Sequence, residues 1–235
     1  MAILKIILAK AFKALLFIVF VVLAVGYTKA FAGLFNDGLS KIIKPPAIWF
    51  FAGIAAYIPV HIIFRRLITL HVFGHELTHA LWALIFGGKV KEIYVSKTQG
   101  GYTTYTGGNF FVSLAPYFFP LYSIAFFIIY KIVVARYQPA LLFMTGAGLS
   151  FHLLLTIYSI RIGQTDLKKT GVIFSLAVIY TLNCLIAGVM IADILKGSGI
   201  RGYLMDGMDN IRAYAPKAAE ITTNTINTTI RLKKN

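Results

Sequence analysis

The sequence predicts an all-α polytopic membrane protein with five or six transmembrane helices and a small β-hairpin after an HExxH helix. Hydrophobic residues make up 58% of the 235 residues and charged residues only 13%, whereas soluble domains have roughly 45–50% and roughly 25%. The apolar residues gather in segments of about 20 residues, the length that crosses a bilayer. One short segment alternates as a strand does. These observations exclude a soluble globular enzyme and a disordered chain.

Six apolar segments account for the helices, and they cover approximately residues 3–35, 47–64, 67–86, 110–134, 140–160 and 171–195. The first contains Lys5, Lys10 and Lys13 and has no small-residue cleavage site, so we expect an uncleaved helix rather than a signal peptide. No glycine or proline turn separates the second segment from the third. They form either two helices or one long helix bent near Pro59, which leaves the span count at five or six.

Residues 90–106 differ from the apolar segments. Their β-branched and aromatic residues alternate around Gly100 and Gly101, which is typical of a β-hairpin; a polar loop is the alternative. The end of the chain is polar, basic and rich in Thr and Asn, and we expect a peripheral tail there. The chain is thus divided into N-terminal transmembrane helices over 1–66, a membrane core over 67–195 and a basic C-terminal tail over 196–235.

The charge is strongly basic, with 23 Lys and Arg against 8 Asp and Glu and a net charge of +15. These cations are dispersed between the apolar segments, as at Lys168 and Lys169, which indicates contact with the headgroups of a lipid bilayer rather than with nucleic acid. We therefore expect an integral, multi-pass protein of the cell or inner membrane. The single cysteine, Cys184, excludes an intrachain disulfide and a cysteine-based zinc site.

The third apolar segment contains the motif His75-Glu76-Leu77-Thr78-His79, an HExxH. On a helix, histidines four residues apart share one face, and their imidazoles can bind one Zn²⁺ at about 2.0–2.1 Å. Glu76 lies beside them, where it can take a proton from a metal-bound water and pass it to a leaving amine. Such a polar cluster is costly in a membrane unless it has a function. The motif therefore predicts Zn²⁺ as cofactor, His75 and His79 as ligands and Glu76 as the catalytic base.

A catalytic zinc takes three protein ligands, so one more is needed. Asp166 is favoured because it lies at a break between two apolar helices, where irregular backbone can reach into the protein. Asp193, close to the end of its helix, and His152, deep in its segment, are the alternatives. In a straight helix His152 is about 21 Å from Asp166, so the two cannot bind the same ion unless the helix unwinds. His152 could instead donate a hydrogen bond to a tetrahedral intermediate or bridge two helices.

Two further histidines lie close to the motif in the sequence. His71 is one turn before His75 on the same stripe of the helix, and we expect it to support the site rather than bind the metal. His61 has no evident partner in the sequence and is interpreted as structural.

Together these features resemble the site-2 protease family, the intramembrane zinc metalloproteases. An HExxH lies within an apolar helix, a strand-like stretch follows it, and an aspartate follows two further apolar helices. The resemblance covers residues 67–195. It implies a zinc-dependent endopeptidase that cleaves transmembrane or juxtamembrane segments of membrane proteins, single-pass ones in particular. His75, His79 and Asp166 would hold the zinc, and Glu76 would activate its water.

The resemblance also implies that the hairpin binds an unwound substrate as an added strand, with its tyrosines at the membrane interface. Two departures indicate a divergent member. Thr78 stands where the family often has glycine, and Asp166 lies in Gln164-Thr165-Asp166-Leu167 rather than in the family's usual proline-containing segment. With no PDZ domain or nucleotide-sensing domain evident, we expect membrane partner proteins or size exclusion to select the substrate.

Three rival functions are weaker. A membrane metalloprotease with a helical glutamate as third ligand needs a later glutamate, and Glu220 in the polar tail is the one available. A di-iron oxidase needs about four carboxylates or many histidines, more than the apolar segments hold. The third rival is a catalytically inactive protease-like scaffold or chaperone, or a metal-binding protein. An intact Glu76 argues against it, because a scaffold does not need the base.

Overall fold

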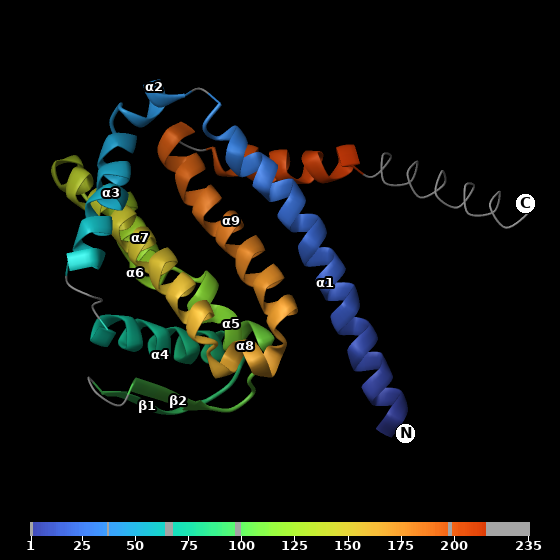
Figure 1. The fold of residues 1–235 in the computed structure, drawn as a ribbon. Coiled ribbons are helices and arrows are strands. Elements are labelled where there is room, and N and C mark those ends of the chain that lie inside the picture. The colour runs from blue at the N-terminus through green and yellow to red at the C-terminus, as the bar shows by residue number, and fades with distance from the viewer. Residues whose placement is uncertain (1, 37, 64–67, 97–99, 197–198, 215–235) are drawn as a thin grey trace, which may run out of the picture.

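The computed structural model describes residues 2–36, 38–63, 68–96, 100–196 and 199–214, so the end of the expected tail lies outside the described residues. Figure 1 shows a mainly helical molecule with one small sheet. The elements are α1 (Ala2–Gly33), α2 (Leu39–Ile42), α3 (Ala47–Ile63), α4 (Ile68–Ile85), β1 (Val90–Ser96), β2 (Gly100–Tyr105), α5 (Phe110–Phe118), α6 (Leu121–Ile132), a 3₁₀ turn (Ala135–Tyr137), α7 (Gln138–Ile162), α8 (Thr165–Thr170) and α9 (Val172–Lys196). A further helix covers residues 200–214.

Three helical stretches are long and apolar enough to cross a membrane: Ile3–Gly33, Ala135–Ile162 and Val172–Leu195. A fourth is possible if α5 and α6 form one broken span, and α3 is a shorter apolar helix. The HExxH helix α4 is not among these candidates. In Figure 1 it runs across one end of the bundle, at a steep angle to α7 and α9. The chain is a helical membrane protein, and the higher count of five or six spans stays a prediction.

The expected fourth segment, 110–134, is not one straight helix. It is divided into α5 and α6, which are bent by 70°. The cause is Pro120: it has no N–H to donate, and it disfavours helical geometry at the residue before it. Phe119 accordingly adopts an extended conformation, with φ −104° and ψ 99°. The bend places α5 beside α4, α8 and α9, around the part of the molecule where the HExxH side chains lie.

Helices α3 and α7 pack with their backbones in close contact. A Cβ at Gly53 would lie 2.0 Å from the Phe143 carbonyl oxygen, and a Cβ at Gly146 would lie 1.9 Å from the Phe50 carbonyl oxygen. Membrane helices approach this closely where small residues line the interface. Helix 200–214 crosses α1 at the other end of the molecule from α4 (Figure 1), with Tyr203 packed against Tyr27.

The two strands form an antiparallel sheet in the segment where the sequence suggests a hairpin. Tyr94 pairs with Tyr102 and Val90 with Tyr105, with an irregularity between Val90 and Glu92. The sheet lies directly against α4 (Figure 1), as contacts of both strands with that helix show. Strand β1 pairs with one edge of β2. Both strands therefore lie along the HExxH helix.

Candidate metal centre

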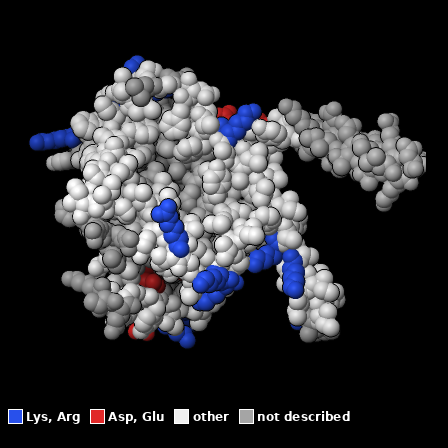
Figure 2. Space-filling view, in the orientation of Figure 1, with Lys and Arg blue, Asp and Glu red and all other residues white. Residues whose placement is uncertain are grey.

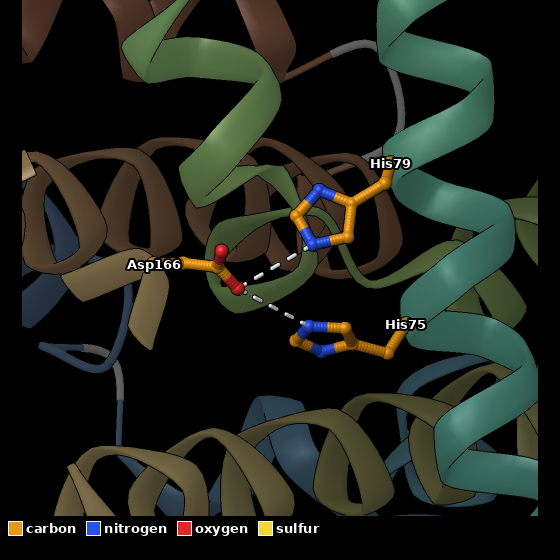
Figure 3. A group of neighbouring side chains, drawn as sticks. All are labelled: His75, His79 and Asp166. Atoms are coloured by element: carbon orange, nitrogen blue, oxygen red, sulfur yellow. Dashed lines mark ion pairs between the residues drawn. The ribbon is translucent and has the colours of Figure 1, made fainter. Parts of the chain in front are cut away.

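Three side chains from two distant parts of the chain meet at one point (Figure 3). His75 and His79 lie one turn apart on α4, with ring centroids 4.9 Å apart. Asp166 comes from α8, and its Oδ2 atom is 3.7 Å from His75 Nε2 and 3.5 Å from His79 Nε2. In the part of the chain that the structure describes, this is the group of His, Cys, Asp or Glu side chains with the geometry for a metal ion.

A break between α7 and α8 brings Asp166 to this point. Helix α7 ends at Gly163 with φ 66°, a left-handed conformation that glycine adopts without steric cost. The chain then restarts as α8 at Thr165, and Asp166 lies in its first turn. The buried Leu167 next to it packs into the apolar core and anchors α8.

The donor set fits zinc. In a tetrahedral site with bonds of about 2.0–2.1 Å, two ligand atoms lie about 3.3 Å apart. The two distances between Asp166 Oδ2 and the imidazole nitrogens exceed this by a few tenths of an ångström, and one ligand atom of each residue lies within 4.8 Å of the others. Two imidazoles and one carboxylate leave a fourth position for water or substrate, as catalytic zinc sites require.

A backbone carbonyl sets the orientation of His79. Its Nδ1 atom lies 2.8 Å from the carbonyl oxygen of Val112 in α5. A carbonyl only accepts, so Nδ1 carries a proton, and Nε2 is the atom that faces Asp166. With a proton, Nε2 can donate to the carboxylate; without one, it can bind a metal ion. Metal-binding histidines are oriented in this way by a partner of their second nitrogen.

Burial raises the pKa of the Asp166 carboxyl, but the two facing imidazoles outweigh the effect of burial and hold that pKa well below its usual range. The carboxyl is therefore ionised, as a metal ligand must be.

Glu76 is buried beside the two histidines and is held by the hairpin. The Thr103 hydroxyl in β2 lies 2.8 Å from Glu76 Oε2 and 3.0 Å from the Glu76 carbonyl oxygen. Close to it, Gly101 leaves no room for a side chain: a Cβ there would lie 2.9 Å from Glu76 Cγ and 2.8 Å from the Tyr94 carbonyl oxygen. Strand β2 therefore packs closely against Glu76 and holds its carboxylate in one position.

A cavity of about 440 Å³ opens over the three side chains and Glu76. Strand β2 forms one wall of this cavity, from Gly101 to Tyr105, and α8 forms another, with Lys169 at its rim. Tyr105 stacks on His79, with centroids 6.1 Å apart. The arrangement can bind a metal ion, hold a proton acceptor beside it and receive an extended chain along β2.

A protein-family model described as Peptidase M50B-like matches residues 47–183, more than half of the chain. The chain belongs to this family. The predicted membership of the site-2 protease family is thereby confirmed. The matched region contains the HExxH helix, the sheet and Asp166. The comparisons with curated proteins and with solved structures give no match.

Two residues that contact this group or Glu76 in the structure were not found from the sequence. Thr103 is one of several threonines in a strand-like stretch, and nothing in the sequence distinguishes it. Tyr117 lies in an apolar run, where an aromatic residue is ordinary; in the structure its hydroxyl lies 3.3 Å from Asp166 Oδ2. Both act through contacts between distant elements, which a linear pattern does not reveal.

The alternative third ligands lie elsewhere. Asp193 is buried and forms an ion pair with Lys131 of α6, so it does not join the group. The Nε2 atom of His152 is 3.0 Å from Asn183 Oδ1. It therefore bridges α7 and α9, as the interhelical interpretation of this residue expects.

The other histidines have partners in the described structure. His71 lies beside the site: its ring centroid is 5.8 Å from that of His75, and its Nε2 is 3.4 Å from Ser159 Oγ. His61 contacts Tyr57 on its own helix, with its Nδ1 3.4 Å from the phenol oxygen. The structure thus supplies a partner that the sequence did not suggest.

Proposed function

We propose that this M50B-like membrane protein is a zinc-dependent intramembrane endopeptidase that cleaves transmembrane or juxtamembrane segments of other membrane proteins. The observation that supports it best is the meeting of three ligand atoms at one point next to a buried glutamate. Asp166 lies 87 positions after His79 in the sequence, and the fold brings the two halves of this group together within a polar cavity. His75, His79 and Asp166 would hold the zinc.

Bound zinc polarises a carbonyl and lowers the pKa of a coordinated water to about 7. The residues of the chain transfer the proton and hold the reacting groups in position. Glu76 accepts the proton of the attacking water and then donates it to the leaving amine. Thr103 keeps the Glu76 carboxylate in place through its hydroxyl. The hydrogen bond from His79 Nδ1 to the Val112 carbonyl oxygen keeps the Nε2 atom on the side that faces Asp166.

The sheet offers a way to hold the substrate. A peptide bond in a transmembrane helix is protected by the hydrogen bonds of the helix, and these must be opened before cleavage. A β-strand can replace them with its own backbone groups when an extended segment pairs with its edge. Strand β2 lines the cavity beside Glu76. A substrate segment paired there would have its backbone next to the proposed metal.

The test uses the purified protein in liposomes with a panel of labelled single-pass membrane peptides. New termini are identified by mass spectrometry. We expect cleavage by the wild type and none by Glu76→Gln, which keeps the size of the side chain but cannot accept the proton. Zinc content is measured on both samples and should be equal. Equal, low cleavage by both proteins would contradict the enzyme and favour a scaffold that binds metal.

A further inference from the structure

The hydroxyl of Tyr117 contacts the group of His75, His79 and Asp166 without being one of its ligands. This tyrosine is 1% exposed, and its hydroxyl lies 3.3 Å from Asp166 Oδ2. Oδ2 is the same oxygen that faces the nitrogens of His75 and His79. The Tyr117 ring also packs edge-on against His75, with centroids 5.3 Å apart and planes at 88°. One side chain therefore contacts ligands from both α4 and α8.

The backbone of Tyr117 is held just as firmly. Tyr117 is the last residue but one of α5, so its carbonyl belongs to the group at a helix end that finds no partner within the helix. Asn183 Nδ2 of α9 donates to this carbonyl at 2.8 Å, and Thr156 Oγ1 of α7 donates to it at 3.3 Å. His152 in turn contacts Asn183 Oδ1. We call Thr156, Asn183 and His152 the carbonyl clamp.

The carbonyl clamp explains why polar side chains lie within two apolar helices. Such residues are costly in a membrane unless they find partners. Here they satisfy a carbonyl that the 70° bend after α5 leaves open. The result is that α7 and α9 fix the position of Tyr117, and Tyr117 contacts Asp166.

We propose that Tyr117 is a positioning residue, which orients the Asp166 carboxylate toward the two histidines through its hydroxyl, and that the carbonyl clamp holds it there. The inference rests on the proposed metal site. A liganding carboxylate that accepts a hydrogen bond from an outer side chain loses less freedom when the ion binds, and such partners commonly change metal affinity 10–100-fold. The competing role for this hydroxyl is a hydrogen bond to the substrate in the transition state.

The experiment measures the zinc dissociation constant of the full-length protein in detergent by competition with a fluorescent chelator. Tyr117→Phe removes only the hydroxyl. We expect zinc to bind roughly 10–100-fold more weakly, with an unchanged melting temperature of the metal-free protein. The control is Tyr203→Phe, because Tyr203 is equally buried and donates its hydroxyl to the Cys184 carbonyl oxygen instead. Its zinc affinity should equal that of the wild type.

A double-mutant cycle separates positioning from general damage. In an Asp166→Ala background, Tyr117→Phe should weaken zinc no further, because the carboxylate through which it acts is gone. An equal loss in both backgrounds would overturn the proposal, as would wild-type zinc affinity in Tyr117→Phe, which would leave only the contact with substrate. A folded wild type that binds no zinc would overturn the proposed function itself, and this inference with it.

Discussion

At the residue scale, the site depends on short side chains from outside the HExxH motif. Thr103 in β2 reaches both the carboxylate and the backbone carbonyl of Glu76. A general base must be held at hydrogen-bond distance from the proton that it takes. The strand thus contributes to the position of the base as well as to the wall of the cavity.

Thr103→Val tests this contact. The substitution keeps the branched shape and removes the hydroxyl, so the Glu76 carboxylate loses its partner while the metal ligands are untouched. We expect kcat to fall about tenfold, a fraction of the 10²–10⁴-fold that a general base contributes, and zinc content to stay unchanged. The measurement is the rate of peptide cleavage in liposomes. Thr106→Val is the matched control, because its hydroxyl accepts from Lys89 N rather than reaching Glu76.

Much of the site could be predicted at this scale, and the reason is chemical. HExxH fixes the spacing of two ligands on any helix, so His75, Glu76 and His79 needed no tertiary information. Asp166 could be favoured because acids are few and it lies at a helix break. Tyr117 and Thr103 could not be predicted, since their roles depend on which elements the fold brings together.

At the element scale, helices are joined by close packing and by an ion pair to a buried carboxylate. Gly146 of α7 allows the backbone of α3 to approach its own. Lys131 of α6 pairs with the buried carboxylate of Asp193 in α9. These contacts hold the bundle on which α4, α5 and α8 place the site.

Gly146→Ala tests the close packing. The new methyl group would overlap the Phe50 carbonyl oxygen, 1.9 Å away, so the helices must move apart. We expect a loss of about 1–3 kcal/mol in the free energy of unfolding, the usual cost of overpacking. Unfolding in detergent is followed by circular dichroism. Gly202→Ala is the control: no atom lies within 4 Å of its added Cβ, and its stability should be unchanged or slightly higher. Equal stability of the two variants would contradict this packing.

Lys131→Met tests the ion pair. It leaves the Asp193 carboxylate buried without a partner, which costs about 3–5 kcal/mol for a fully buried pair. Because Lys131 is 44% exposed, we expect a smaller loss, about 2 kcal/mol. The double variant Lys131→Met/Asp193→Leu should recover part of it. A double variant less stable than Lys131→Met alone would show that the carboxylate has another role.

Sequence and structure also differ at the element scale. Hydropathy locates apolar helices, but it does not give their directions in the fold; α4, for example, lies across one end of the bundle (Figure 1). The division of 110–134 into α5 and α6 follows from Pro120, a residue visible in the sequence. The angle between the two helices, 70°, depends on the packing around α5 and is not visible in the sequence.

At the scale of the whole molecule, the charges and the apolar surface agree with a membrane environment. Figure 2 shows a face that is largely free of charge, with separate lysine and arginine side chains, most of them in its lower half. Many large apolar side chains of α1 are exposed, such as Ile3, Phe12 and Ile18. An apolar surface of this kind is favourable in contact with lipid and unfavourable in contact with water.

The molecule thus combines an apolar helical body with a polar cavity at the end where the sheet lies. The central claim is that His75, His79 and Asp166 of this M50B-like protein bind one zinc ion. It concerns the fold as a whole, because the two halves of the group are brought together by the arrangement of α4, α5 and α8.

The most direct test is elemental analysis of zinc in the purified, desalted protein, with wild type, Glu76→Gln, Asp166→Ala and Asp193→Asn compared. We predict about one zinc per chain in the wild type, Glu76→Gln and Asp193→Asn, and a large loss in Asp166→Ala, because a two-histidine site lacks its third ligand. Full zinc content in Asp166→Ala, or no zinc in a folded wild type, would contradict the account.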